Sequence, residues 1–180
     1  MKAVRFHQHG GVEVLRYEDA PDPVAHDGRA LIRVRACALN HLDLWERRGI
    51  ERVTLPLPHI SGSDIAGEVI EPGSSGLAPG TRVMLQPGLR CGRCRACTEG
   101  RDNQCTCYDV LGLQSDGGYA QSIAVPAENL HGGIENAVAG LHLTILTKQA
   151  KVSNDGFVSA GFSRPGNISP PAGTGRCRPV

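Results

Sequence analysis

Short stretches of alternating apolar and polar residues recur along most of the chain. In ALIRVRAC, Ile32 and Val34 fall on one side and Arg33 and Arg35 on the other. Alternation with a period of two is typical of a half-buried strand. Upstream, KAVRF and VEVLRY flank the turn His9-Gly10-Gly11 and predict an N-terminal hairpin.

A short helix is predicted next, over HLDLWERRG, with Gly49 as its end. Further strands are predicted in DIAGEVIE, TRVMLQP and GGYAQSIAVP, the last entered through Gly117 and Gly118. Glycine-rich and proline-rich turns separate these strands, as in PGSSGLAPG. Many short strands with such corners predict a mainly β fold of barrel type with short helices.

The pattern changes after Leu130. Residues 131–150 could form one helix, whereas residues 151–180 are rich in Gly, Pro and Ser and show no periodicity, so we expect them to be poorly ordered. We therefore predict one domain over residues 1–130, with a helix and an irregular tail after it.

Composition narrows the functional classes. The net charge of +1 is spread along the 180-residue chain, which argues against nucleic acid and against membrane surfaces as partners. We find no apolar run of the length that a signal peptide or a membrane span needs. We expect a cytoplasmic protein with reduced thiols that acts on a small molecule, and predict no oligomeric state.

Five of the seven cysteines lie in the segment 89–107, and four of them form a closely spaced group. Their spacing is C-x2-C-x2-C-x7-C, formed by Cys91, Cys94, Cys97 and Cys105. Close-set thiolates suit a tetrahedral structural Zn²⁺, one per chain, and four protein ligands leave no position for substrate. Nearby arginines, at positions 90, 93, 95 and 101, would offset the thiolate charge. Two disulfides or a nucleic-acid zinc knuckle are the alternatives, and Cys107 could replace Cys105.

This cysteine lobe and the strands before it resemble the N-terminal, GroES-like domain of the medium-chain dehydrogenase/reductase family. The family includes zinc alcohol dehydrogenases and quinone oxidoreductases. The resemblance runs through MKAVRF, VRACALNHLDLW, LPHISGSDIAGEV, PGTRVM, the lobe and GGYAQSIAVPAENL. It implies a GroES-like barrel with a structural zinc lobe, and a small-molecule substrate.

The resemblance also locates a catalytic zinc in the family's alcohol dehydrogenases, held partly by a Cys and a His. Asn40 stands at the position of that Cys and Ser63 at that of the His. Amide and hydroxyl groups are poor zinc ligands, so we expect no catalytic metal. Cys37 is interpreted as a core residue, and His41 and His59 as surface or hydrogen-bonded groups.

Asn40 and the Ser63-Asp64 pair instead resemble the quinone-oxidoreductase branch, in which hydride passes from NAD(P)H to a carbonyl or activated alkene. The resemblance implies that Asn40 donates a hydrogen bond near the nicotinamide, with Ser63 as a second catalytic candidate. Asp43 and Asp64 would be supporting groups and Trp45 a pocket wall. Asn40 could equally be the cap of the following helix, and both interpretations stay open.

The family's second domain, a Rossmann fold, is not predicted here, since only 50 residues follow Leu130. Gly173-Thr174-Gly175 does not follow a strand and lacks the third glycine, so no residue is predicted to bind a cofactor. The family resemblance fades near Thr147, and we expect a truncated, frameshifted or chimeric C-terminus. Two hypotheses result: a fragment of an NAD(P)H-dependent oxidoreductase, inactive unless the missing domain is supplied, or a stand-alone zinc-stabilised binding or assembly module.

Overall fold

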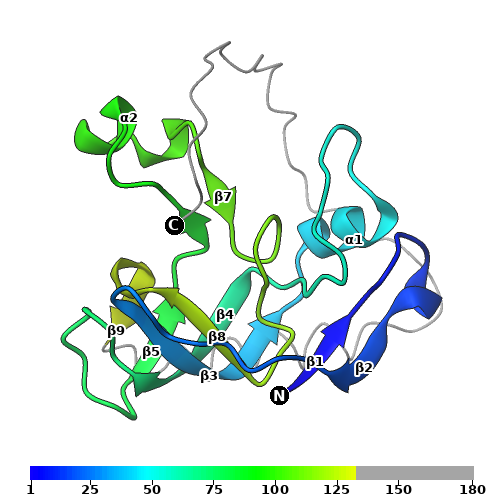
Figure 1. The fold of residues 1–180 in the computed structure, drawn as a ribbon, viewed down its shortest axis with the longest axis horizontal. Helices are drawn as coiled ribbons and strands as arrows, with labels where there is room; N and C mark the ends of the chain where they lie inside the picture. The colour runs from blue at the N-terminus through cyan, green and yellow to red at the C-terminus, as the bar shows by residue number, and fades with distance from the viewer. Residues whose placement is uncertain (133–180) are drawn as a thin grey trace.

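A computed structural model describes residues 1–132, and these are mainly β (Figure 1). Residues 151–180, expected to be irregular, lie outside the described residues, as does most of the helix expected over 131–150. The predicted helical stretch IENAVAGLHLTILTKQAK lies wholly outside the described residues, and the two described residues before it, His131 and Gly132, belong to a strand that starts at Leu130.

The helices and strands follow one another closely along the chain. The strands are β1 (Lys2–Arg5), β2 (Arg16–Asp19), β3 (Arg29–Ala38), β4 (Asp64–Glu71), β5 (Arg82–Leu85), β6 (Gly88–Leu89), β7 (Asp109–Val110), β8 (Ser122–Pro126) and β9 (Leu130–Gly132). The helices are α1 (His41–Arg48) and α2 (Arg95–Thr98), with 3₁₀ turns η1 (Val12–Val14), η2 (Asp102–Gln104) and η3 (Ala127–Asn129).

A five-stranded sheet with the order β8-β3-β4-β5-β9 is the centre of the fold. Strand β3 pairs antiparallel with β4 on one side and β8 on the other. The predicted alternation is confirmed, since Ile32 is fully buried while Arg33 and Arg35 are exposed. All ladders between the described strands are antiparallel, so residues 1–132 contain no Rossmann sheet.

Apolar side chains from this sheet form the main core. Strands β3, β4, β5 and β8 contribute residues at alternate positions, because successive side chains point to opposite faces. The buried members are Ala30, Ile32, Ile65, Val69, Val83, Leu85, Leu111, Ile123 and Val125. Leu111, which follows β7, is the member that ties the chain after the cysteine lobe to the sheet.

Strands β1 and β2 form the predicted N-terminal hairpin, with Ala3 opposite Glu18. Its second half differs from the prediction, because Val12–Val14 is a 3₁₀ turn and the strand begins only at Arg16. Val14, the last residue of this turn, is buried in one apolar cluster with Phe6 and Leu55. The hairpin joins the rest of the domain through Val4 N–H, which donates to Tyr119 O at 2.8 Å.

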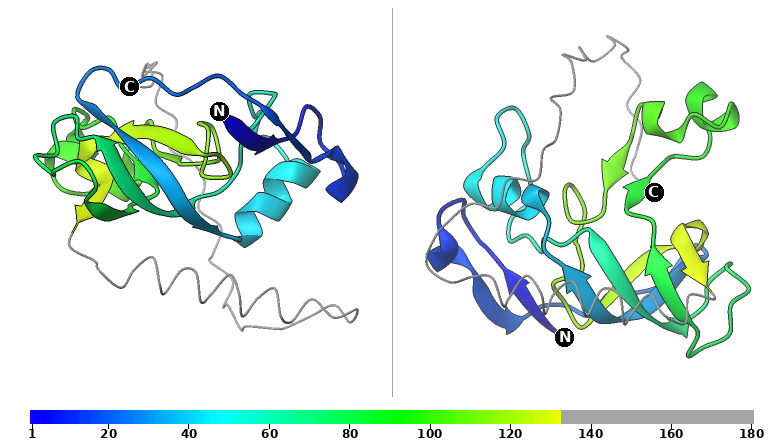
Figure 2. Two further views of the ribbon diagram at one scale, coloured as in Figure 1. Left: turned by 90° about the horizontal axis from the view of Figure 1, so that it is seen from below. Right: turned by 180° about the vertical axis from the view of Figure 1, so that it is seen from behind.

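Helix α1 and the segment that carries α2 and β7 extend from the same side of the central sheet and are well separated from each other (Figure 1). The two views of Figure 2 show the same separation from below and from behind. The cysteine lobe and helix α1 therefore lie in different regions of the domain.

Among the described residues, no helix is both long and apolar enough to cross a membrane.

Candidate metal centre and catalytic site

The cysteine lobe leaves the domain through β6 and returns through β7. These two strands pair antiparallel, with Leu89 opposite Asp109. The chain between them makes α2 and η2, and Cys94 is the residue that precedes α2. Short turns of this kind can place several cysteines around one point without a core of their own.

The four predicted cysteines come together. Their sulfur atoms all lie within 4.8 Å of one another, and those of Cys94 and Cys97 are 3.5 Å apart. None of the four is in a disulfide, so the alternative of two bridges is wrong. Tetrahedral zinc with bonds of ~2.3 Å sets its sulfur ligands about 3.8 Å apart, so the cluster fits the ion. Cys107 is not a member; its N–H donates to Cys105 Sγ at 3.3 Å.

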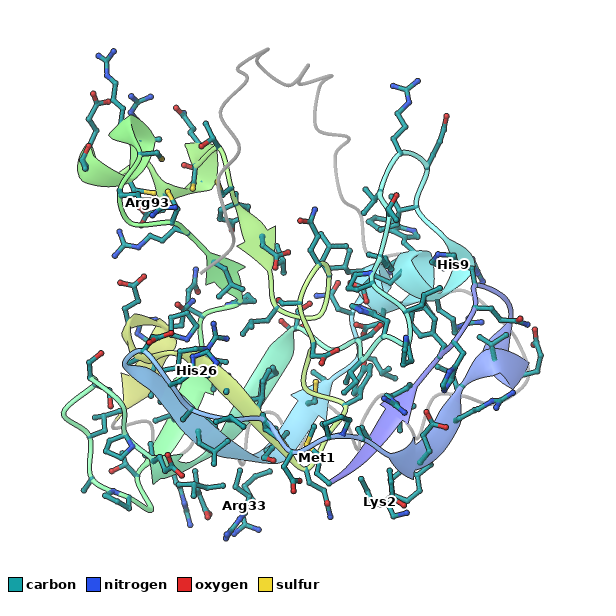
Figure 3. All side chains as sticks on the ribbon, viewed as in Figure 1. Met1, Lys2, His9, His26, Arg33 and Arg93 are labelled. Atoms are coloured by element: carbon teal, nitrogen blue, oxygen red, sulfur yellow. The ribbon has the colours of Figure 1, made fainter. Side chains whose placement is uncertain are left out.

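Backbone N–H groups of the lobe point at the sulfurs. Hydrogen bonds from the backbone of Arg93, labelled in Figure 3, and of Cys94 lower the pKa of Cys91. The same effect, mainly from the Cys97 backbone, lowers the pKa of Cys94 to about 6. Burial acts in the opposite direction on Cys97 and raises its pKa to about 12. The lobe thus stabilises some thiolates before any metal binds.

The arginines of the lobe contribute less to the thiolates than the sequence suggested, because acidic residues neutralise most of them. Arg95 and Arg101 both pair with Glu99. Arg90 pairs with Asp102 at 3.0 Å. The support for negatively charged sulfur therefore comes chiefly from backbone donors, which the sequence pattern does not reveal.

Asn40, the first catalytic candidate, is the N-cap of α1, as one of the two interpretations predicted. Its Oδ1 accepts from Leu42 N–H at 3.2 Å, and its own N–H donates to Asp43 Oδ2 at 2.7 Å. This reciprocal arrangement is a capping box. One N–H of the Asn40 amide group donates to Asp64 Oδ2 at 3.1 Å. The amide carries two such hydrogens, so a donor remains for a ligand.

Ser63, the second candidate, lies immediately before β4 and is almost fully buried. Its hydroxyl makes no hydrogen bond to any of the described residues. The preceding Gly62 has φ +107°, and a Cβ there would lie 2.7 Å from Cys37 Sγ. Only glycine fits this position, which brings the segment close to β3. The Asn40–Asp64 hydrogen bond places both candidates at one end of α1.

The other residues singled out in the sequence have structural positions. His59 is fully buried and its Nε2–H donates to Gly112 O at 2.7 Å, whereas His41 is exposed beside Trp45. Cys37 is half-buried against the sheet core, as expected. Trp45 itself is 55% exposed and does not wall a closed pocket. Neither histidine belongs to a metal-binding group in the described part of the chain.

The buried polar face of helix α1 is the feature that the sequence pattern did not predict. This face is formed by Asp43, Glu46 and Arg47, while Trp45 stays largely exposed. Asp43 accepts a hydrogen bond of 2.6 Å from the Tyr119 hydroxyl. Hydropathy alone would bury the opposite face. The only signal available was the spacing of three and four residues within the polar set.

Comparisons with known proteins agree on one family. The model described as "Alcohol dehydrogenase GroES-like domain" matches residues 26–134. The chain is 35% identical over 135 residues to an NAD-dependent alcohol dehydrogenase of Sulfolobus acidocaldarius, and 32% identical over 173 residues to a D-altritol 5-dehydrogenase of Agrobacterium fabrum. It resembles a crystal structure of an NAD-dependent alcohol dehydrogenase with a TM-score of 0.71 and 43% identity.

These matches cover most of this chain but less than half of each relative. They cover 70%, 93% and 76% of this chain, but only 38%, 48% and 40% of the three relatives. The chain thus spans less than half the length of the proteins it matches. The D-altritol 5-dehydrogenase match, at 93% of the chain, extends beyond Thr147, where the sequence pattern alone placed the end of the resemblance.

Proposed function

The chain belongs to the alcohol dehydrogenase GroES-like domain family, and on that premise we propose that it is the substrate-side domain of an NAD(P)H-dependent oxidoreductase without a catalytic metal. Its substrates would be small molecules with a carbonyl or an activated alkene. The observation that carries the proposal is the pair Asn40 and Ser63, joined at one end of α1 through Asp64.

The donor set supports an active site without metal. Of the described residues, only the four cysteines of the lobe form a group of three or more metal-binding side chains. The Asn40 amide and the Ser63 hydroxyl are poor ligands for zinc but good hydrogen-bond partners for a substrate oxygen. The chemistry that remains to these residues is orientation and polarisation of the substrate.

A bound nicotinamide would supply the hydride. Asn40 would donate its remaining N–H to the substrate oxygen, on which negative charge develops as the hydride arrives. Asp64 and the backbone of Leu42 hold the amide in one orientation, so this donor needs no reorganisation during the reaction. Ser63 precedes Asp64 in the chain, and its hydroxyl, which has no partner among the described residues, would be the second hydrogen-bonding group for the substrate.

Exposed apolar side chains on and next to helix α1 also favour a second domain that would cover this part of the surface. Leu39, Leu44 and Trp45 are 60%, 37% and 55% exposed, although they are large and apolar. A local concentration of exposed apolar side chains is typical of a surface that another domain or a ligand covers. The relatives are more than twice as long as the matched part of this chain, and the remainder of such a protein would provide this cover.

The four cysteines have a separate role in the proposal. Such a cluster is typical of a structural zinc, and its sulfurs use all four positions of a tetrahedral ion. Bound zinc would lock the loop between β6 and β7. The lobe therefore supports the fold and takes no part in hydride transfer.

A fusion tests the proposed activity. Residues 1–147 are joined to the cofactor domain of the Sulfolobus acidocaldarius relative. We expect NAD(P)H-dependent reduction of an enone or quinone, and poor oxidation of simple alcohols, because the latter benefits from a metal that lowers the hydroxyl pKa. Asn40→Ser keeps a capping oxygen and removes the amide donor, so kcat should fall by roughly 100-fold.

The control is Asn103→Ala, an exposed asparagine in the lobe, which should leave kcat unchanged. Ethanol oxidation that stops at once with a chelator and returns with Zn²⁺ would contradict the proposal. So would full activity in Asn40→Ser.

A further inference from the structure

Buried polar side chains fill the contact between α1 and the segment 59–63. Glu46 and His59 are both fully buried, with Glu46 Oε2 lying 3.9 Å from His59 Nε2. Six side-chain atoms in this contact make no hydrogen bond within the described residues: Asp43 Oδ1, Glu46 Oε1, Glu46 Oε2, His59 Nδ1, Ser61 Oγ and Ser63 Oγ. Ordinary cores satisfy such atoms, so this contact is unusual for a purely structural one.

The orientation of His59 follows from its surroundings. The Gly112 carbonyl can only accept, so Nε2 carries the proton and, in a neutral ring, Nδ1 carries a lone pair. Burial lowers the pKa of His59, an effect that Asp109 and Asp116 oppose. Phe6 packs edge-on against the ring, with 5.4 Å between centroids. These contacts hold the ring in one orientation, and burial favours the neutral imidazole over the protonated form.

Burial also favours the neutral form of Glu46, here by raising the pKa of its carboxyl group. Burial raises its pKa to about 7, and the nearby carboxylates of Asp43 and Asp109 act in the same direction. The Ser61 hydroxyl opposes the shift but forms no hydrogen bond of good geometry. Within residues 1–132, the adjacent Arg47 forms no ion pair with Glu46, and its guanidinium instead donates to Gly10 O at 2.9 Å.

Both residues are linked directly to the proposed site. Glu46 lies on the helix that Asn40 caps, and His59 precedes Ser63 by four residues in a segment whose backbone is pinned, since Ile60 O and Gly62 O accept from Gly117 and Gly118. His9, labelled in Figure 3, contacts the same turn of α1, with its Nδ1 2.9 Å from Glu46 O. A change in the charge of Glu46 therefore acts on the contact between the two elements that hold the candidates.

We propose that Glu46 and His59 are positioning residues of this site, and that the proton on the Glu46 carboxyl sets how closely α1 packs against the segment 59–63. With the carboxyl neutral, two neutral groups face each other and the helix packs tightly. When the carboxyl releases its proton to solvent, a buried charge faces a neutral ring, and α1 shifts toward water with its Asn40 cap. The proposal rests on the proposed function only for the role of Asn40 and Ser63.

Nuclear magnetic resonance of the whole chain, without cofactor or substrate, tests this. We expect the ¹³C signal of the Glu46 carboxyl to titrate with a midpoint near its raised pKa of about 7. The Leu42 amide and the Asn40 side-chain amide, which report the cap, should shift with the same midpoint. In Glu46→Gln, which has the same shape but no charge, both reporters should stay constant between about pH 6 and 8.

Two further variants separate positioning from simple packing. Glu51→Gln removes an 89% exposed carboxyl just beyond α1 and should leave the titration of the cap unchanged. Glu46→Ala removes the titrating group and leaves a cavity, so it should destabilise the protein at every pH, whereas Glu46→Gln should not.

A Glu46 midpoint below about pH 5 would overturn the proposal, as would cap signals that do not follow Glu46. An inactive fusion protein together with the expected titration would contradict the proposed function and leave the coupling of Glu46 to the cap standing.

Discussion

Single residues in this domain can have two roles, although a sequence motif usually assigns only one role to a residue. Asn40 caps α1 and still has an N–H to donate, because an amide has more hydrogen-bonding capacity than a cap requires. Cys91 and Cys94 are ligand candidates whose thiolates are supported by backbone N–H groups. In both cases, the function of the side chain depends on the backbone that surrounds it.

Replacement of one cysteine tests the metal centre. We expect the purified chain to contain one zinc, and Cys94→Ser to lose it, because three thiolates and a hydroxyl bind the ion far more weakly. Metal content is measured by mass spectrometry on reduced protein. Cys37→Ser is the matched control and should keep its zinc, since Cys37 packs against the sheet core. Two zincs per chain, or none, would contradict this prediction.

The cap of α1 gives a second prediction at this scale. Asn40→Ala should lower the free energy of unfolding by about 1 kcal/mol, because Leu42 N–H loses its acceptor. Asn40→Ser should lose only a few tenths, since its hydroxyl can accept the same bond. Chemical denaturation monitored by Trp45 fluorescence measures both. Equal stability of wild type and Asn40→Ala would show that the capping box contributes nothing.

At the scale of secondary-structure elements, the contacts between elements determine which face of a helix is buried. Helix α1 exposes Trp45 and buries Glu46, so its intrinsic amphipathicity does not choose its buried face. A buried polar atom without a partner costs about 1–3 kcal/mol, and the fold tolerates several in this contact. Buried polar groups that lack partners within the protein are typical of functional regions, where a ligand or a proton can satisfy them.

The segment before β4 is similarly constrained by one glycine. Gly62→Ala should destabilise the domain by roughly 2 kcal/mol or more, because φ is +107° and the new methyl group would meet Cys37 Sγ at 2.7 Å. Adding Cys37→Ala should restore only part of the loss, since the strain in φ remains. Thermal unfolding of the single and double variants provides the measurement. Gly76→Ala, also at positive φ but with open space around it, is the control for strain alone.

At the scale of the whole molecule, we expect different interactions to stabilise the cysteine lobe and the central sheet. No lobe cysteine belongs to the described core clusters, and Arg90 joins the lobe to η3 through Glu128, whereas its pair with Asp102 lies within the lobe. Ion pairs of half-exposed groups contribute little, about 0–1 kcal/mol. We therefore expect the lobe to depend on a bound metal, and the sheet to depend on apolar burial.

Metal removal should therefore affect only part of the molecule. After treatment with a strong chelator, we expect backbone amides of residues 91–108 to exchange with deuterium much faster, because bound zinc supplies most of the folding energy of such a loop. Amides of β3 and β4 should keep their protection, since their core is separate. Hydrogen exchange by mass spectrometry resolves the two regions. Loss of protection in β3 together with the lobe would show that metal and sheet form one cooperative unit.

The sequence by itself determined the local features of this protein. Alternation predicted β3, and Gly49 predicted the end of α1. The cysteine spacing predicted the cluster, because ligands a few residues apart can meet around one ion without help from the rest of the fold. These features depend on neighbours within a few residues, which is the range over which sequence patterns are informative.

Only the tertiary structure decided which groups face each other across longer separations. The Val12–Val14 turn, the pairing of Arg90 with Glu128 and the buried face of α1 all depend on residues distant in sequence or on backbone geometry. Glu46 and His59 are 13 positions apart on two different elements, and nothing in their local sequence indicates that both are buried. Burial sets their protonation, and burial is a property of the assembled fold.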